Sequence, residues 1–257
     1  MEQEKEQTAI ITVTALTPQG RKSARETVCR ELPLAIYVNG SEVATVLCSP
    51  ADLEDLVFGF AFSEGMIETA EDIKALEIDH KQNTARLTIT YEYKPKAGLS
   101  PLIATGGGRL LRKAQEERST GKKLFASARQ IVCLMESFLQ NSRVYSATRG
   151  IHSAAIASPE EIIICRDDIG RHNALDKVFG SSMRHGTNLQ EYIVITSGRI
   201  SSEMLLKAAS HGCPIILTKA APTDMGVKLA EKLGVTLVRC ARDLTVTVYC
   251  HDWRIRD

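Results

Sequence analysis

The chain lacks any long apolar run. No stretch approaches the roughly 20 residues that a membrane-spanning helix needs, and Met1–Glu6 is acidic rather than apolar, unlike a secretory signal peptide. We therefore expect a cytoplasmic protein without a membrane span. An excess of one charge is also missing, because 25% of the residues are charged and the formal net charge is +1. This balance argues against a general nucleic-acid or membrane-surface binder.

Close cysteine and histidine pairs are missing too. None of the seven cysteines belongs to a Cys-x-x-Cys pair, and the six histidines are scattered. Zinc sites usually need such pairs, so no metal site is predicted. In a reducing compartment the odd cysteine count predicts free thiols, most of them buried apolar residues. No Walker-type phosphate loop, dinucleotide fingerprint or nucleophile elbow occurs in the sequence.

The order of the expected elements divides the chain into two domains. Alternating apolar residues and turn signals predict a small α+β domain over 8–105. Residues 106–123, which begin with three glycines and carry many basic side chains, are interpreted as a connecting loop. Strands alternate with helices over 124–257, and this predicts a three-layer α/β domain. We expect its sheet to be largely parallel, with an antiparallel pair at the end.

A hairpin and a helix are predicted in the front domain. Two alternating segments, 34–38 and 42–48, flank Asn39-Gly40, which supplies both positive φ angles of a type I′ turn. Apolar residues at helical spacing follow. Ser49 is expected to cap this helix, because Pro50 suits the first helical position.

Polar clusters lie at strand ends of the back domain. They occupy 148–153, 168–173, 196–203 and 219–223. Ligands of open α/β sheets bind outside the carboxyl ends of strands. Four such clusters in one sheet therefore predict a nucleotide-sized pocket.

The turn Ser197-Gly-Arg199 has the clearest chemistry. A helix opens at Ser201 or Ser202, and its free N–H groups and dipole favour an anion. Arg199 can pair with a phosphate bidentately. An ordinary helix cap beside a surface arginine explains this turn equally well. His152 and His172 are placed in the same pocket as hydrogen-bond donors or stacking surfaces, although a single histidine beside a strand is more often structural.

Several motifs together resemble the FdhD/NarQ family of formate dehydrogenase accessory proteins. They are Glu31–Leu34, Val38–Gly40, Gly59–Gly65, Gly150–Ala154, Asp168–Lys177, Ser197–Arg199, Ala221–Thr223 and Thr247–Tyr249. The resemblance implies a cytidine deaminase-like fold for the back domain. It also implies a sulfur carrier that receives sulfur from a cysteine desulfurase and passes it to a molybdenum or tungsten bis-guanine-dinucleotide cofactor. That cofactor then activates apo-formate dehydrogenase, and the family implies a homodimer.

The resemblance also implies a set of cofactor-binding residues, in a pocket that GDP or GMP can share. Arg171, Arg199 and Arg242 are expected to hold phosphates. His152, His172 and Asn173 are expected to shape the base or pterin site, and Asp168 to orient Arg171 or accept from guanine. The full set is His152, Asp168, Arg171, His172, Asn173, Ser197, Arg199, Cys240, Ala241, Arg242, Asp243, Leu244 and Thr245. For Cys240–Thr245, the spacing alone favours a polar turn between two edge strands without a binding role.

The sulfur-carrying loop departs from the family pattern. Where other members have Thr-Gly-Cys-Gly-x-Cys-Gly, this chain has Thr105-Gly-Gly-Gly-Arg-Leu-Leu111. Gly107 and Leu110 occupy the cysteine positions, and glycine has no thiolate to carry sulfur. Three explanations stay open: Cys240 substitutes, the protein binds and presents the cofactor without carrying sulfur, or the chain is a diverged or engineered form.

No catalytic residue is therefore secure, and sulfurtransferase activity is left open. Deamination is excluded on the residues. A zinc deaminase needs His-x-Glu with Pro-Cys-x-x-Cys, whereas the nearest match here is His152-Ser153-Ala154.

Overall fold

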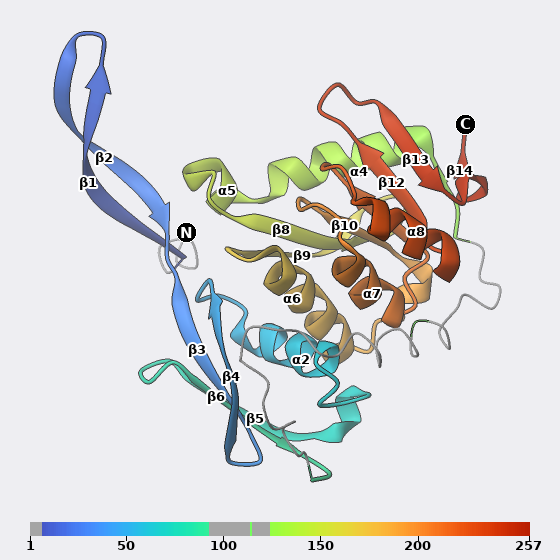
Figure 1. Ribbon diagram of the computed structural model, residues 1–257, viewed down its shortest axis with the longest axis horizontal. Coiled ribbons are helices and arrows are strands. Elements are labelled where there is room, and N and C mark those ends of the chain that lie inside the picture. The colour runs from blue at the N-terminus through green and yellow to red at the C-terminus, as the bar shows by residue number, and fades with distance from the viewer. Residues whose placement is uncertain (1–6, 93–113, 115–123) are drawn as a thin grey trace.

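The computed structural model describes residues 7–92, 114 and 124–257, and shows two sheets that pack through helices (Figure 1). The expected connecting loop, 106–123, lies outside the described residues except for Ala114. The front elements are β1 (Thr8–Thr17), β2 (Gly20–Cys29), β3 (Leu32–Val38), β4 (Ser41–Cys48), α2 (Leu53–Ser63), η1 (Ala70–Asp72), β5 (Ile73–Asp79) and β6 (Thr84–Ile89).

The back elements follow the connecting segment. They are β7 (Ala126–Ser127), α4 (Ala128–Asn141), α5 (Arg143–Thr148), β8 (His152–Ala157), β9 (Ile162–Asp168), α6 (Arg171–Arg184), η2 (Leu189–Glu191), β10 (Ile193–Thr196), α7 (Ser202–Ser210), β11 (Ile215–Thr218), α8 (Asp224–Leu233), β12 (Thr236–Cys240), β13 (Val246–Cys250), η3 (Asp252–Arg254) and β14 (Ile255–Arg256). Among the described helices, none combines the length and apolar character needed to cross a bilayer.

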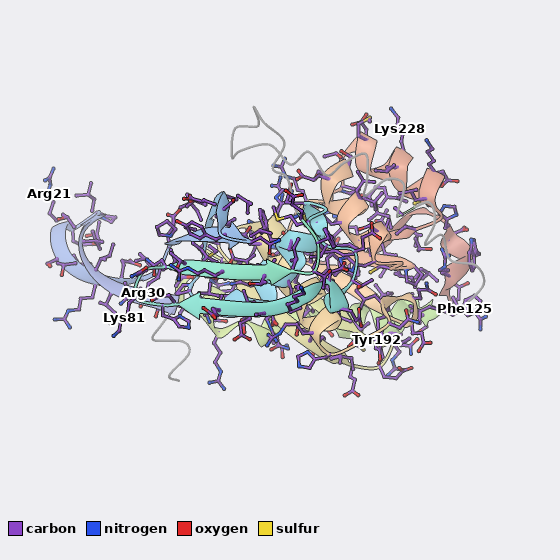
Figure 2. All side chains as sticks on the ribbon, turned by 90° about the horizontal axis from the view of Figure 1, so that it is seen from below. Arg21, Arg30, Lys81, Phe125, Tyr192 and Lys228 are labelled. Atoms are coloured by element: carbon purple, nitrogen blue, oxygen red, sulfur yellow. The ribbon has the colours of Figure 1, made fainter. Side chains whose placement is uncertain are left out.

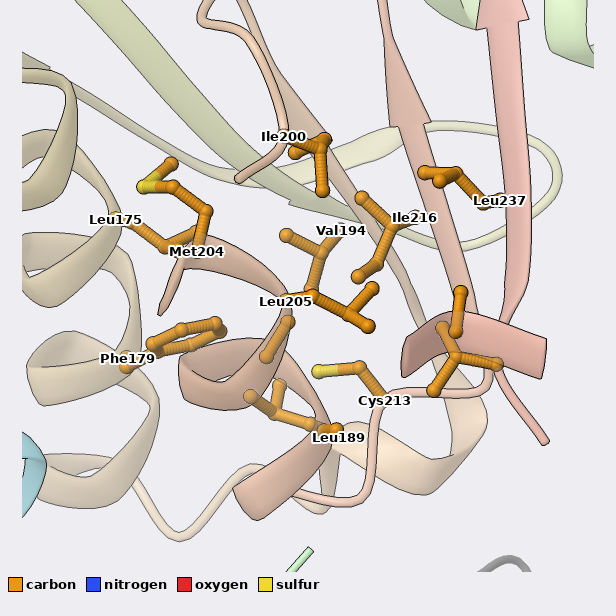
Figure 3. Close-up of a cluster of buried hydrophobic side chains, with 14 of the residues drawn as sticks. Leu175, Phe179, Leu189, Val194, Ile200, Met204, Leu205, Cys213, Ile216 and Leu237 are labelled. Carbon is orange, nitrogen blue, oxygen red and sulfur yellow. The ribbon is translucent and has the colours of Figure 1, made fainter. Parts of the chain in front are cut away.

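The back domain has three layers around a six-stranded sheet of order β13-β12-β11-β10-β8-β9. Alternate residues of each strand point to opposite faces. Val194, Ile216 and Leu237 face α6, α7 and α8, and Figure 3 shows them meeting Leu175 and Met204 from the helices. The residues of opposite parity form a second core with α4: Ala155, Ile193, Ile195, Ile215, Leu217 and Val238. The predicted α/β class is confirmed.

The expectation of a largely parallel sheet is wrong. Of its five neighbouring strand pairs, only β10–β11 and β11–β12 are parallel. Strand β8 is antiparallel to both β10 and β9, and β13 is antiparallel to β12, as expected for the last pair. The physical reason is the connection length, because a tight turn joins β8 to β9, whereas parallel neighbours need a crossover of a dozen or more residues.

The front domain packs α2 on a four-stranded sheet of order β4-β3-β6-β5. The predicted hairpin is confirmed, with Asn39 at φ 47° and Gly40 at φ 85°. The predicted helix start is wrong, because α2 begins after Asp52, which adopts φ 53°. Ser49 does not cap the helix; its hydroxyl instead donates to the Asp168 carboxylate at 3.0 Å.

Strands β1 and β2 form a separate two-stranded ribbon that projects from the body (Figure 1). Figure 2 places Arg21 on the ribbon at one end of the molecule, far from Lys228. The strand register places Ala9, Ile11 and Val13 on one ribbon face together with Glu26 and Lys22, and it places Ile10 and Leu16 on the other face. Ile10, Ile11 and Leu16 are 68%, 44% and 72% exposed, so both faces present apolar side chains to solvent.

Helices α2 and α6 cross with their backbones in direct contact and join the two domains. A Cβ added to Gly59 would lie 1.9 Å from the Asp176 carbonyl oxygen, and one added to Gly180 would lie 1.9 Å from the Asp55 carbonyl oxygen. Only glycine fits at either position. The interface also buries the Lys207–Asp176 ion pair at 2.6 Å, and Ser63 donates to the same carboxylate at 2.7 Å.

We expect Gly180→Ala to lower the free energy of unfolding by about 3 kcal/mol or more, because the added methyl group forces the two helices apart. Chemical denaturation measures the loss. Ser137→Ala, on the exposed face of α4, is the control and should change stability by less than about 0.5 kcal/mol. A Gly180→Ala protein as stable as the parent would contradict the close crossing.

Candidate functional site

The predicted polar clusters converge on one edge of the back sheet. Thr196, at the end of β10, pairs with Thr218 at the end of β11 and with Ala154 of the antiparallel β8. His152, at the start of β8, pairs with Asp168 at the end of β9. Both parallel strand ends and the neighbouring hairpin therefore open onto the same edge. We call this edge the rim and define it by residues 145–153, 168–173, 196–203, 219–223 and 240–245.

The Ser197-Gly-Arg199 turn lies at the centre of the rim. The Ser197 hydroxyl accepts from the Ser153 backbone N–H at 3.0 Å and lies 3.3 Å from His152 Nδ1. Helix α7 starts at Ser202, and the Ser201 hydroxyl accepts from the Met204 backbone N–H at 3.3 Å. One of the backbone N–H groups at the start of α7, which were expected to bind an anion, therefore already donates to Ser201. Arg199 is exposed and forms no ion pair with a described carboxylate.

Arg171 lies across this turn. A Cβ on Gly198 would come within 3.0 Å of the Arg171 Cβ, so the missing side chain makes room for the arginine stem. The Arg171 Nε is buried and has no hydrogen-bond partner among the described residues. A buried N–H donor without a partner costs free energy, and an anion at the rim would satisfy it. The structure thus places the Arg171 side chain beside Gly198, the residue that precedes Arg199 in the turn.

The two histidines differ in their surroundings. His172 Nε2 lies 3.3 Å from the Glu203 carboxylate, and this contact is the main reason why the pKa of Glu203 is lowered. Burial, together with the positive charges of Arg171 and Lys219, lowers the pKa of His152 below its usual 6.5. His152 is therefore neutral at pH 7 and has a ring nitrogen within reach of Ser197.

Asp168 has a different role from the one expected. It is fully buried; its Oδ1 accepts from the Gly170 backbone N–H at 2.9 Å, and its Oδ2 lies 2.7 Å from Lys177 Nζ. The backbone and hydroxyl of Ser49 both donate to Oδ2 at 3.0 Å. The carboxylate therefore anchors the rim to the front domain. It has no exposed oxygen for a guanine, and it does not hold Arg171.

Asn173 shares this anchoring role. Its Nδ2 donates to Asp168 Oδ1 at 3.0 Å and to the Leu47 carbonyl oxygen at 2.8 Å. Both amide protons are thus used within the protein. Of the polar groups on the Asn173 side chain, only the carbonyl oxygen is left to contact a base.

Residues 240–245 form the turn between β12 and β13. The Ala241 backbone N–H donates to the Thr245 carbonyl oxygen at 3.0 Å, and Leu244 adopts φ 64°. Arg242, Asp243, Leu244 and Thr245 are exposed. Hydrogen bonds from Thr245 lower the pKa of Asp243, so this carboxylate is ionised. Arg242 is therefore the residue of this turn that suits a phosphate.

Cys240 is poorly placed to substitute for the missing carrier cysteine. Its side chain is fully buried in the core beneath α4, and burial raises the pKa of its thiol. Cys48 and Cys165 are similar, since burial raises the pKa of each to about 12. Cys29 is half-buried, and its sulfur lies 3.0 Å from the hydroxyl of the rim residue Thr148. Gly107 and Leu110 lie outside the described residues.

Sequence reasoning missed three rim residues. The ring of Tyr145 lies between the Arg149 guanidinium, 5.1 Å from its centroid, and Lys219 Nζ, 4.7 Å away. Arg149 and Lys219 belong to two of the predicted clusters but were not singled out. Tyr145 sits on the short helix α5, and no pattern in the sequence marks it.

Comparison with known proteins identifies the family. Residues 29–256 match the FdhD/NarQ family, so the chain belongs to it. The chain is 38% identical over 234 residues to the sulfur carrier protein FdhD of Geobacillus kaustophilus, covering 88% of each chain. It is 36% identical over 252 residues to that of Halalkalibacterium halodurans, covering 95% of this chain and 93% of the relative.

A solved structure agrees with this assignment. The structure, from Desulfotalea psychrophila, is assigned as a formate dehydrogenase accessory protein. It superposes with a TM-score of 0.81 at 28% identity, over 96% of this chain and 99% of that one. The resemblance drawn from the motifs is therefore confirmed.

We expect Asp168→Asn to destabilise the protein by about 3–5 kcal/mol, because it leaves the buried Lys177 ammonium without a charged partner. Thermal or chemical unfolding measures this. The matched variant Asp168→Asn/Lys177→Met removes both charges, and should lose at least about 1 kcal/mol less than the sum of the two single variants. Strictly additive losses would show that the two groups are not coupled.

Proposed function

We propose that this protein serves formate dehydrogenase maturation by holding a molybdenum or tungsten bis-guanine-dinucleotide cofactor at the rim. The observation that carries the proposal is the convergence of cationic side chains on one sheet edge. Family membership supports formate dehydrogenase as the enzyme that receives the cofactor, since a related structure is assigned as a formate dehydrogenase accessory protein.

The charge of the rim fits a phosphate-bearing ligand. Arg171, Arg199, Lys219 and Arg242 form no ion pair with a carboxylate in the part of the chain that the structure describes. Asp168, the buried acid nearby, is already neutralised by Lys177. Unpaired cations at strand ends create a positive potential that attracts anions. Bidentate arginine contacts then give geometric selectivity for phosphate.

A binding and presenting role is the one that this geometry supports best. Gly107 offers no sulfur nucleophile, and the Cys240 thiol is buried with a raised pKa. Holding the cofactor requires only the rim. His152, neutral and half-buried, would contribute hydrogen bonds to the base or pterin, and Arg171 and Arg199 would hold phosphate.

Sulfur carriage is the second candidate function. The names of the relatives favour it, and so does the position of Cys29 beside the rim. In this version the Cys29 thiolate attacks the outer sulfur of a cysteine desulfurase persulfide. A new persulfide forms on Cys29, and the desulfurase thiolate leaves.

The partners follow from the same proposal. Apo-formate dehydrogenase would receive the cofactor in the cytoplasm, and a cysteine desulfurase would take part only if sulfur is carried. We also propose a homodimer. The β1–β2 ribbon supports it, because a two-stranded ribbon is marginal alone and the exposed apolar side chains Ile10, Ile11 and Leu16 suit contact with a second copy.

The rim predicts GDP binding in the micromolar range or tighter, about −8 kcal/mol. Arg199→Ala should weaken this binding about 10- to 100-fold, because a hydrogen bond to a charged group contributes about 1.5–3 kcal/mol. Isothermal titration calorimetry measures both values. Lys81→Ala, an exposed cation of the front domain, is the control and should bind like the parent. A parent protein that does not bind GDP at millimolar concentration would overturn the proposal.

Persulfide trapping separates the two candidate functions. After incubation with a cysteine desulfurase and cysteine, followed by alkylation and peptide mass spectrometry, we expect no additional sulfur on Cys240. Its buried thiol cannot reach the donor. The exposed Cys133 reports non-specific labelling. A persulfide on Cys29 above the Cys133 level, abolished in Cys29→Ser, would establish sulfur carriage. Labelled Cys240 would contradict the burial argument.

A further inference from the structure

Tyr145, Arg149 and Lys219 form a compact group on the α5 side of the rim. Tyr145 is half-buried on α5, Arg149 ends that helix with φ 56°, and Lys219 follows β11. The two cations approach the same aromatic ring, at 5.1 Å and 4.7 Å from its centroid. Segments separated by about 70 positions in the sequence therefore place two positive charges around one phenol.

The charges of this group are not neutralised by protein acids. Neither Arg149 nor Lys219 forms an ion pair with a carboxylate among the residues that the structure describes. A hydrogen bond from the Arg149 side chain, followed by the positive charge of Lys219, lowers the pKa of the Tyr145 phenol. Lys219 also lowers the pKa of His152. Two cations held together without an acid repel each other, and a bound anion would relieve this repulsion.

The group is distinct from the Ser197-Gly-Arg199 turn. Arg171 lies against that turn at Gly198, whereas Lys219 reaches from the next strand toward α5. His152 belongs to the same edge, since its Nδ1 is 3.3 Å from the Ser197 hydroxyl and both Arg171 and Lys219 lower its pKa. The rim therefore offers two cationic groups, both close enough to act on one neutral imidazole.

We propose that Tyr145, Arg149 and Lys219 form a second anion subsite, which holds the outer phosphate of a nucleoside diphosphate while Arg171 and Arg199 hold the inner one. This inference rests on the proposed function and adds to it the recognition of a diphosphate. Arg149 and Lys219 supply charge, and the Tyr145 hydroxyl donates a hydrogen bond to a phosphate oxygen. Cation–π contact with the ring keeps both cations in place.

Nucleotide selectivity tests the subsite. We expect the parent to prefer GDP over GMP, and Arg149→Gln/Lys219→Gln to weaken GDP binding about 10- to 100-fold while GMP binding changes less than about 3-fold. Tyr145→Phe keeps the ring and should weaken GDP binding by a smaller factor, about 5-fold. Lys74→Gln/Lys81→Gln removes two exposed positive charges from the front domain, away from both the rim and the ribbon, and should bind like the parent. Thermal unfolding of each variant checks that the fold is intact.

A spectroscopic titration tests the subsite independently of nucleotide binding. Inorganic pyrophosphate would neutralise the cations and raise the pKa of Tyr145, so phenolate absorbance should fall at a pH slightly below the usual tyrosine value of about 10. The change should be absent in Tyr145→Phe and in Arg149→Gln/Lys219→Gln.

The outcomes distinguish the proposed anion subsite from the proposed nucleotide-binding function. A pyrophosphate signal without GDP binding would retain the subsite and reject the nucleotide function. Unchanged GDP-over-GMP preference in the double variant, with no phenolate change in the parent, would reject the subsite and retain the nucleotide function. Absence of both signals would reject both.

Discussion

The backbone contact between α2 and α6 is the constraint on which the rest of the structure depends. Gly59 and Gly180 have no side chains, and each helix therefore lies against a carbonyl oxygen of the other. At this separation Lys177 reaches Asp168 and Ser49, and Lys207 reaches Asp176, all within the buried interface. Because the charges are removed from water, each pair must keep both partners. The two domains are thereby held in one fixed arrangement.

This arrangement has a direct consequence for the candidate site. Asp168 accepts from the Gly170 backbone, so the buried ion pair fixes the start of α6 and with it Arg171. The residue expected to contact the ligand instead supports those that can. The cations at the rim stay unpaired because the neighbouring Asp168 carboxylate forms its ion pair with the buried Lys177 instead. Structural and binding roles are divided between adjacent residues of one motif.

The family assignment and the glycine at position 107 together bear on whether the protein transfers sulfur or only binds the cofactor. The chain shares the fold of its relatives over nearly its full length, yet glycine stands at position 107. Loss of a thiol removes a nucleophile without changing the positive charge at the sheet edge. Under the proposed function, binding a phosphate-bearing cofactor and transferring sulfur to it are separable, because the first would need only the rim cations and the second a reactive thiol.

Much of this protein was predictable from sequence because local patterns determined it. Alternating apolar residues marked the strands, Asn39-Gly40 marked a hairpin, and the motif Asp168–Lys177 marked the family and the edge where the site lies. Only the tertiary structure decided which polar residues face outward. Asp168 and Asn173 face inward because a segment more than 100 positions away meets them: Ser49 donates to the Asp168 carboxylate, and the Leu47 carbonyl oxygen accepts from the Asn173 amide. Tyr145 meets Arg149 and Lys219 at the rim because folding brings α5 close to the residue that follows β11. Periodicity records which side of an element is apolar, whereas the partner of a polar group depends on distant segments brought together by folding.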